Sequence, residues 1–309
     1  MRSVPIITSR YPLWEQGNLQ ADIEAGRFYL PDAKSGKRET LVTSVLDAEP
    51  IQCLRVGGVS YIPMISALAL GGVFIALTFH WWIPTIICAI ITFIAIIWWL
   101  WTGTAQVPEA EKVDVGLGQK LPAYVSGPAS VGWWAMFITM VGDGTAFASL
   151  IFGYFFYWTV HDDYTAGATG PGAFWPMVAL VLFVVAWLLT IAARELNEKR
   201  TIGCRVALCA GIVVTIAACL AGLAGPHVHG MDPTANVYPA TVWVIILWTV
   251  LHGAVGIIMQ TYCLARSFAG RMTKEYDQDI RNVTLYWHFM AFTAIVTFAV
   301  LGLFPMVSR

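Results

Sequence analysis

The sequence predicts an all-α integral membrane protein with seven transmembrane helices, arranged as a two-helix hairpin followed by a five-helix bundle. Of the 309 residues 58% are hydrophobic and 12% are charged, whereas charged residues make up about a quarter of a typical soluble domain. Seven apolar runs reach the roughly 17 to 25 residues that a helix needs to cross a bilayer. The basic residues, moreover, are confined to alternate connections between these runs.

The seven predicted spans are residues 62–79, 83–101, 131–158, 174–193, 203–224, 240–265 and 284–305. A run such as "MVALVLFVVAWLL" lacks the apolar–polar alternation of a transmembrane β-strand, so the helical interpretation is favoured. Only "HWW" joins the first two spans, which predicts a tight hairpin over 62–101. A linker rich in Gly and Pro, 102–130, separates it from the five-helix bundle over 131–309.

The distribution of Lys and Arg predicts the orientation of the bundle, because these residues are retained on the cytoplasmic side of a membrane. The segment before the first span holds seven of the 18 basic residues. Ten more lie in or beside the connections after the second, fourth and sixth spans, and only Arg309 lies at the opposite end. We therefore expect the amino terminus inside and the carboxyl terminus outside, with the linker 102–130 in the cytoplasm.

The head, residues 1–61, is predicted to be a partly ordered cytoplasmic segment. Its first residues, "MRSVPIITSRYPLW", lack the apolar core and cleavage site of a signal peptide. Turn signals in "LPDAKSGKRE" stand beside the alternating run "TLVTSV". Its seven acidic and seven basic residues balance each other, which argues against a basic membrane-binding face.

The cysteines and histidines do not predict a redox centre in this chain. The six cysteines lack paired metal spacing and are expected to be small buried hydrophobic residues. Within the spans only His252 and His288 occur; their depths of about 20 and about 6 Å from the cytoplasmic ends of their helices are too different for one shared metal ion. In the outer loop "PHVHGMD", His227, His229 and Asp232 are expected to be solvated, with a metal site as the alternative.

Asp143, in "VGDGT", is the only acidic residue inside a predicted span. Twelve residues from the start of that span, it lies about 18 Å deep, near the middle of the membrane. A carboxylate at that depth costs roughly 2.5 to 3.5 kcal/mol, so we expect it to turn inward, protonated or hydrogen-bonded, with His252 as a partner if the two helices adjoin. A structural hydrogen bond between helices and a proton-handling site are both compatible with this position.

Three short motifs resemble those of cytochrome c oxidase subunit III. The last span begins with "LYWHF", as in that family, and the third span places a Met seven residues before its acid. The sixth span has "LHGAV", which matches the family's Phe-His-Gly-x-His in part. The matching residues are Met136, Asp143, His252, Gly253, Tyr286, Trp287, His288 and Phe289. Asp143 stands where the family usually has Glu, and Val255 where it has a second His.

The resemblance implies a non-redox subunit of a bacterial haem–copper terminal oxidase in the cytoplasmic (inner) membrane, packed against subunits I and II. Haem and copper would belong to the partners, and phospholipid would bind in the cleft between hairpin and bundle. The intramembrane acid would support proton uptake and sustained turnover. Residues 1–14 resemble the tail of subunit I, as in chains that fuse subunits I and III.

Other functions remain as alternatives. A proton-coupled secondary transporter also uses an isolated intramembrane acid, although such carriers usually contain repeats and interrupted helices. A residual fragment of a fused oxidase chain is another. A retinal protein requires an intramembrane Lys, which none of the predicted spans contains, and neither it nor a seven-span receptor has an inside amino terminus. No feature of the sequence suggests nucleic-acid binding.

Overall fold

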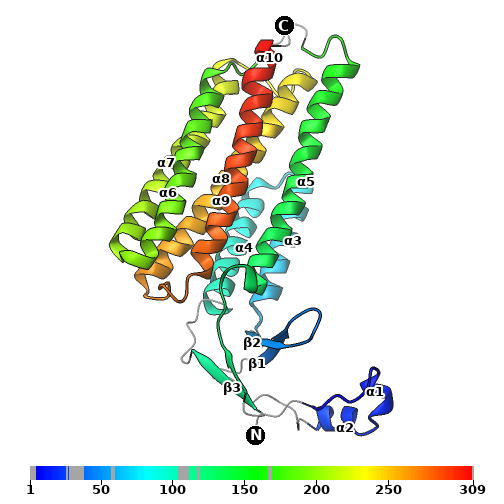
Figure 1. Cartoon of the computed structure of the whole chain (residues 1–309). Helices are drawn as coiled ribbons and strands as arrows, with labels where there is room; N and C mark the ends of the chain where they lie inside the picture. Colours follow the sequence, from blue (N-terminus) through cyan, green and yellow to red (C-terminus); the bar gives the residue numbers. More distant parts are fainter. Residues whose placement is uncertain are drawn as a thin grey trace. The chain divides into compact units, whose positions relative to one another are not determined.

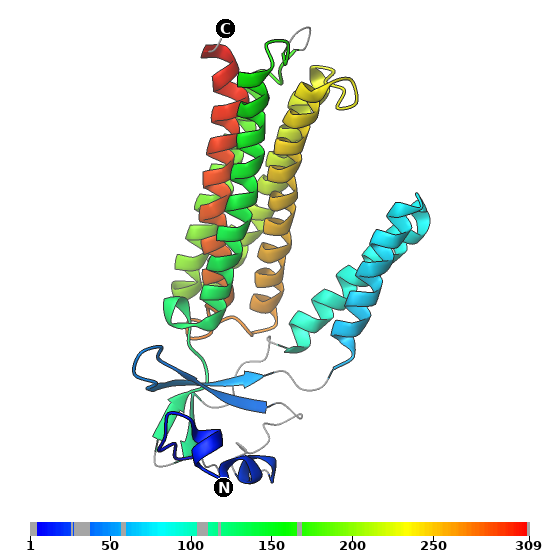
Figure 2. The same cartoon turned by 90° about the vertical axis from the view of Figure 1, so that its right-hand side faces the viewer.

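The protein is a multi-pass membrane protein whose described residues are mostly helical (Figures 1 and 2). The computed structural model describes residues 5–25, 27, 38–56, 60–103, 111–116, 119–165 and 169–307. The chain divides into two compact units, Met1–Val125 and Ser126–Arg309. Six described helices are long and apolar enough to cross a membrane, and one shorter apolar helix precedes them.

The first unit contains four helices and four short strands in its described part. They are α1 (Pro12–Glu15), α2 (Leu19–Glu24), β1 (Arg38–Thr43), β2 (Pro50–Val56), α3 (Ile62–Thr78), α4 (Trp82–Gly103), β3 (Lys112–Gly116) and β4 (Gln119–Pro122). Helices α3 and α4 pack together as the predicted hairpin. With 17 residues, α3 is at the short end of the range that spans a bilayer.

The strands of the first unit form two antiparallel hairpins, β1–β2 and β3–β4. The first includes part of the alternating run "TLVTSV", whereas the second lies in a linker for which the sequence predicted no strands. Val115 of β3 and Leu121 of β4 are buried with Cys53 of β2, and Leu41 and Val113 pack against them. The head and the linker therefore build one small apolar cluster together.

The second unit is a bundle of five long helices. They are α5 (Val131–Val160), α6 (Phe174–Lys199), α7 (Thr201–Val228), α8 (Val237–Phe268) and α9 (Gln278–Phe298). A 3₁₀ turn, η2 (Gly127–Ala129), precedes α5, and a π-helical segment, η3 (Ala299–Leu303), joins α9 to the final short helix α10 (Phe304–Val307). Helix α9 contacts α5, α6 and α8 and is the most buried of the long helices, so it forms the centre of the bundle.

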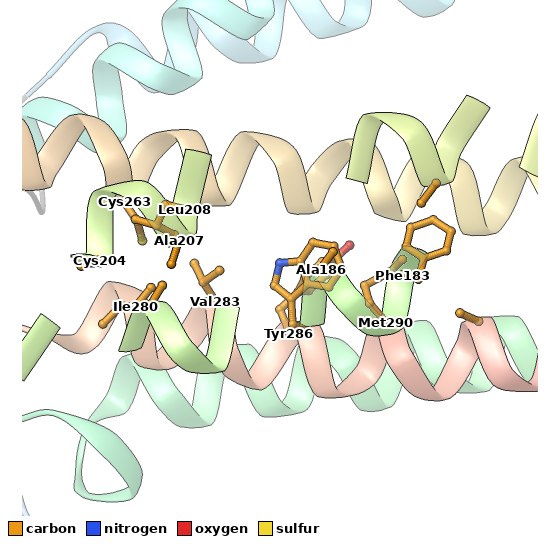
Figure 3. Close-up of a cluster of buried hydrophobic side chains, with 14 of the residues drawn as sticks. Phe183, Ala186, Cys204, Ala207, Leu208, Cys263, Ile280, Val283, Tyr286 and Met290 are labelled. Atoms are coloured by element: carbon orange, nitrogen blue, oxygen red, sulfur yellow. The ribbon is translucent and has the colours of Figure 1, made fainter. Parts of the chain in front are cut away.

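Small residues let the helices of the bundle approach closely. Ala186 of α6 and Ala207 of α7 are buried in a cluster with larger side chains such as Phe183 and Met290 (Figure 3). Ala294 of α9 belongs to the same cluster. Such small residues are typical of packing between transmembrane helices, where lipid provides no hydrophobic driving force and van der Waals contact must substitute for it. The cluster fixes α6, α7, α8 and α9 relative to one another.

The observed helices extend beyond several predicted spans. The span predicted at 174–193 continues to Lys199, the one at 240–265 begins at Val237 and ends at Phe268, and the one at 284–305 begins at Gln278. These additional turns carry polar and charged residues, which a search for apolar runs does not include. Several of these polar residues are buried in the protein, among them Asn197, Arg266 and Ser267.

The prediction for the cysteines is confirmed in part. Cys53, Cys204 and Cys263 are buried, Cys88 and Cys219 are half-buried, and Cys209 is exposed. For Cys209 the prediction is wrong, because this side of α7 faces away from the other helices of the bundle.

Candidate functional site

Three polar residues of the sequence motifs lie on three adjoining helices. Asp143 lies on α5, His252 on α8 and Tyr286 on α9, and α5 contacts both of the other helices. The Asp143 Oδ2 atom is 3.7 Å from the His252 Nε2 atom. This separation is within the range of an ion pair and about 0.7 Å longer than a typical N–H···O hydrogen bond of about 3.0 Å.

The His252 ring is oriented by its own helix. Its Nδ1 atom is 2.8 Å from the carbonyl oxygen of Trp248, one turn earlier on α8. A carbonyl oxygen only accepts hydrogen bonds, so Nδ1 carries a proton and donates it. The Trp248 ring lies against the imidazole, with 4.1 Å between the ring centroids. In the neutral imidazole Nε2 is consequently the free acceptor, and it faces the carboxyl group of Asp143.

Tyr286 fixes the backbone of α8 at the same level. Its hydroxyl group donates a hydrogen bond of 2.7 Å to the carbonyl oxygen of His252, and the side chain is only 4% exposed. Phe289, one turn further along α9, contributes a ring whose centroid is 6.2 Å from that of His252. Tyr286 and Phe289 of the opening motif of the last span therefore help to position His252.

Gly253 and Trp287 have packing roles beside this pair. A Cβ atom at Gly253 would lie 2.7 Å from the Cys219 sulfur and 3.1 Å from the ring of Phe183, so α8 can approach its neighbours only with glycine here. Trp287 is fully buried and lies against Gly256. Met136 packs against the buried cluster that contains Phe183 and Trp287.

Asp143 is less enclosed than the sequence predicted. Its side chain is 38% exposed, against 16% for His252, so the histidine is the more enclosed of the two. The glycines that flank Asp143 differ: nothing among the described residues is within 4 Å of a Cβ at Gly142, whereas a Cβ at Gly144 would lie 3.7 Å from the Phe289 ring. Thr145, Ala146, Ala148 and Ser149 are exposed.

His288 belongs to a different environment from His252. Its Nδ1 atom accepts a hydrogen bond of 2.8 Å from Nε1 of Trp187, and it lines a pocket with Arg194 and Arg281. The structure therefore brings Asp143 together with His252 and leaves His288 outside this pair. Neither Trp187 nor the carbonyl of Trp248 could be predicted from the sequence, because neither a backbone oxygen nor a single partly buried tryptophan forms a recognisable pattern.

The outer-loop residues are engaged locally. His229 Nδ1 donates to the carbonyl oxygen of Gly225 at 2.8 Å. Asp232 accepts hydrogen bonds from the backbone N–H and the hydroxyl group of Thr234, and these bonds lower the pKa of the Asp232 carboxyl group below its usual value. Among the described residues no three His, Cys, Asp or Glu side chains are grouped as metal ligands.

The Asp143–His252 pair can hold one proton in two ways. Either the carboxyl group is protonated and the imidazole neutral, or the proton resides on Nε2 and the two groups form an ion pair. Both forms have zero net charge, which limits the cost of placing ionisable groups in a membrane. The chain matches no protein-family model and no curated protein.

Proposed function

We propose that this chain is the non-redox subunit III of a bacterial haem–copper terminal oxidase. In this proposal all seven apolar helices, α3 included, cross the cytoplasmic membrane, and α3–α4 and α5–α9 are the two transmembrane parts. The amino terminus lies inside, and subunits I and II contain the haem and copper. The chain supports the stability of subunit I and its proton uptake during aerobic electron transport.

One observation carries the proposal: the three sequence motifs, which are far apart in the chain, meet at a single point. The acid of α5 faces the histidine of "LHGAV", and the tyrosine of "LYWHF" donates to the backbone of that histidine. Three unrelated chance matches would have no reason to converge. The convergence supports a common purpose for these residues, which is to place one ionisable pair at mid-membrane depth.

The geometry of the pair supports a role in proton supply. One proton can pass between Asp143 Oδ2 and His252 Nε2 after a small movement, because the atoms are 3.7 Å apart. The partly exposed side of Asp143 opens on the surface of α5, where a partner subunit can pack against the small residues around it. We propose that subunit I contacts this surface and that Asp143 buffers protons for its uptake path.

A secondary transporter accounts less well for the structure. Carriers of that kind typically bind substrate where helices are interrupted at mid-membrane, whereas α5, α6, α7 and α8 are each continuous over their whole length. The π-helical segment η3 lies near the carboxyl terminus, far along the chain from the Asp143–His252 pair. The continuous helices favour a supporting subunit over a carrier.

The test is to express the chain with its oxidase subunits I and II and to compare the wild type with Asp143→Ala and Asp143→Asn. The expected result is an assembled complex with normal initial oxygen consumption in both variants, but a shorter active lifetime or a lower proton stoichiometry. Ser149→Ala on the same exposed surface is the matched control and should behave as wild type. Failure of the chain to co-purify with subunit I would reject the proposal. Unchanged lifetime and stoichiometry in both variants would reject the role of the acid.

A further inference from the structure

A second polar site lies at the end of the bundle where α5 begins and α6 ends. It is an open pocket with an empty volume of about 520 Å³. The pocket is lined by Gly127, Pro128, Trp133, Arg194, Arg281, Thr284, Leu285 and His288. None of these lining residues is acidic, and three of them carry nitrogen donors on charged or titratable side chains. The pocket is separate from the Asp143–His252 pair.

The wall formed by η2 is held in place by hydrogen bonds. The Gly127 N–H donates to Gln278 Oε1 at 2.8 Å, and Trp134 Nε1 donates to the carbonyl oxygen of Pro128 at 2.9 Å. Gly127 has a φ of +72°, a conformation that glycine adopts without strain. The entry to α5 is thus tied to the first turn of α9, and the pocket between them is a defined feature of the fold.

The two arginines of the pocket differ in their partners. Arg281 forms an ion pair with Asp277, with 2.5 Å between Nε and Oδ2. Its Nη2 atom also lies 4.0 Å from Oε1 of Glu198. Arg194 forms no ion pair or hydrogen bond within the described part of the chain, and its Nε atom is buried without an acceptor. The Arg194 side chain as a whole is half-buried and lines the pocket. An acceptor from outside the chain can therefore bond to its terminal N–H groups, and a charge-assisted hydrogen bond there would stabilise the protein.

His288 supplies a further donor. Its Nδ1 atom accepts the hydrogen bond from Trp187, and an imidazole nitrogen that accepts has no proton. In the neutral ring the proton is therefore on Nε2, which makes that atom an N–H donor. The pocket accordingly combines a guanidinium group without a partner, a second guanidinium group and an imidazole N–H. Such a set of donors suits a phosphate group, whose oxygens accept several charge-assisted hydrogen bonds.

The apolar part of the pocket indicates which kind of phosphate fits. The ring of Trp133 stacks on that of Phe137, one turn deeper on α5, with 5.5 Å between centroids and an interplanar angle of 4°. Phe137 is exposed, and Leu285 lines the pocket beside Trp133. This apolar strip leads from the basic residues along a membrane-crossing helix. It offers a surface for an acyl chain, whereas a soluble anion has no apolar part that could pack against it.

We propose that this pocket binds the phosphate group of an anionic phospholipid, with Arg194 as the principal contact and the Trp133–Phe137 strip along one acyl chain. Basic pockets between transmembrane helices are a known means of binding anionic headgroups. The inference is independent of the proposed oxidase function, since it depends only on the bundle and on its location in a membrane.

The test uses the purified full-length chain in a neutral detergent. Binding of dihexanoylphosphatidylglycerol, dihexanoylphosphatidylcholine and inorganic phosphate is measured by thermal shift and by native mass spectrometry. We expect one saturable phosphatidylglycerol site and weaker binding of the other two probes. Arg194→Gln should weaken phosphatidylglycerol binding at least tenfold. Arg200→Gln, which removes one charge from an exposed position at the same end of α6, should leave it within twofold.

Equal phosphatidylglycerol affinity in Arg194→Gln and Arg200→Gln would overturn the proposal. Inorganic phosphate binding as tightly as phosphatidylglycerol, and unaffected by Phe137→Ala, would overturn the assignment to a lipid. If Arg194→Gln does not fold, Arg194→Lys retains the charge but loses the planar two-donor geometry. Its affinity should fall below that of Arg200→Gln, and an unchanged affinity would again overturn the proposal.

Discussion

Replacement of Gly256 by alanine should destabilise the bundle through a single tight contact. A Cβ atom at this position would lie 3.0 Å from Cζ2 and 3.4 Å from Cε2 of Trp287. Trp287 is 0% exposed, so its ring cannot move into lipid or water. The ring or α8 must shift by a few tenths of an ångström, and α9, which carries Trp287, is packed against three other helices.

The magnitude follows from the cost of overpacking, which is about 1–3 kcal/mol for an additional methyl group in a well-packed core. Alanine also favours a helix over glycine by up to about 1 kcal/mol, which would partly hide the penalty. Gly142→Ala on α5 is the matched control, because no described atom lies within 4 Å of its Cβ position. It has the same gain in helix propensity, so the difference between the two variants isolates the contact with Trp287.

The assay is equilibrium unfolding of the purified chain in mixed micelles with increasing dodecyl sulfate, followed by circular dichroism. The free energy of unfolding of Gly256→Ala should be about 1–3 kcal/mol below that of Gly142→Ala. In a Trp287→Phe background, where the second ring is absent, the penalty of Gly256→Ala should shrink. Equal stabilities of the two alanine variants would refute the packing argument.

Three further predictions concern the pair, the topology and the cofactors. A double-mutant cycle with Asp143→Asn and His252→Gln should give a coupling free energy of about 0.6 kcal/mol, the average for polar pairs between membrane helices, and at most about 1.7 kcal/mol; additive effects on unfolding would show that the pair does not interact. Reporter fusions after Gly118, Lys199 and Lys274 should report the cytoplasm and those after Asp163 and Asp232 the outside, and a reversed pattern would contradict the charge distribution. The purified chain alone should be colourless, and a stoichiometric haem spectrum would disprove this.

The helices were predictable because the thickness of the bilayer fixes the length of an apolar run. The start of α5 at Val131 and that of α6 at Phe174 agree with the predicted spans. The ends of α6 and α8 were not predictable from the sequence, since the last turns of these helices are polar and the thickness of the hydrocarbon layer does not fix their length. The β3–β4 hairpin was missed for another reason: its strands are short, and Val115 is buried by contact with residues such as Cys53, far away in the sequence.

The depth of the candidate site was predictable from the sequence, but the direction in which the Asp143 side chain points was not. Counting residues placed Asp143 and His252 at similar depths, and the structure has them 3.7 Å apart. The exposure of Asp143 depends on the rotation of α5 about its own axis, which the neighbouring helices determine. An apolar run as long and as uniform as that of α5 has no preferred face, so its sequence pattern contains little information about this rotation.

The exposure of Asp143 has a consequence for how the protein exists in the membrane. A carboxyl group at mid-depth that faced lipid would cost roughly 2.5 to 3.5 kcal/mol, and His252, 3.7 Å away, is a polar partner that offsets part of this cost. The remaining 38% of exposed side-chain surface still requires polar or protein surroundings. Only 11% of the most apolar stretch of α5 is buried within the described structure. A protein surface that covers α5 would therefore stabilise the chain and place the Asp143–His252 pair at the contact, as the proposed packing against subunit I requires.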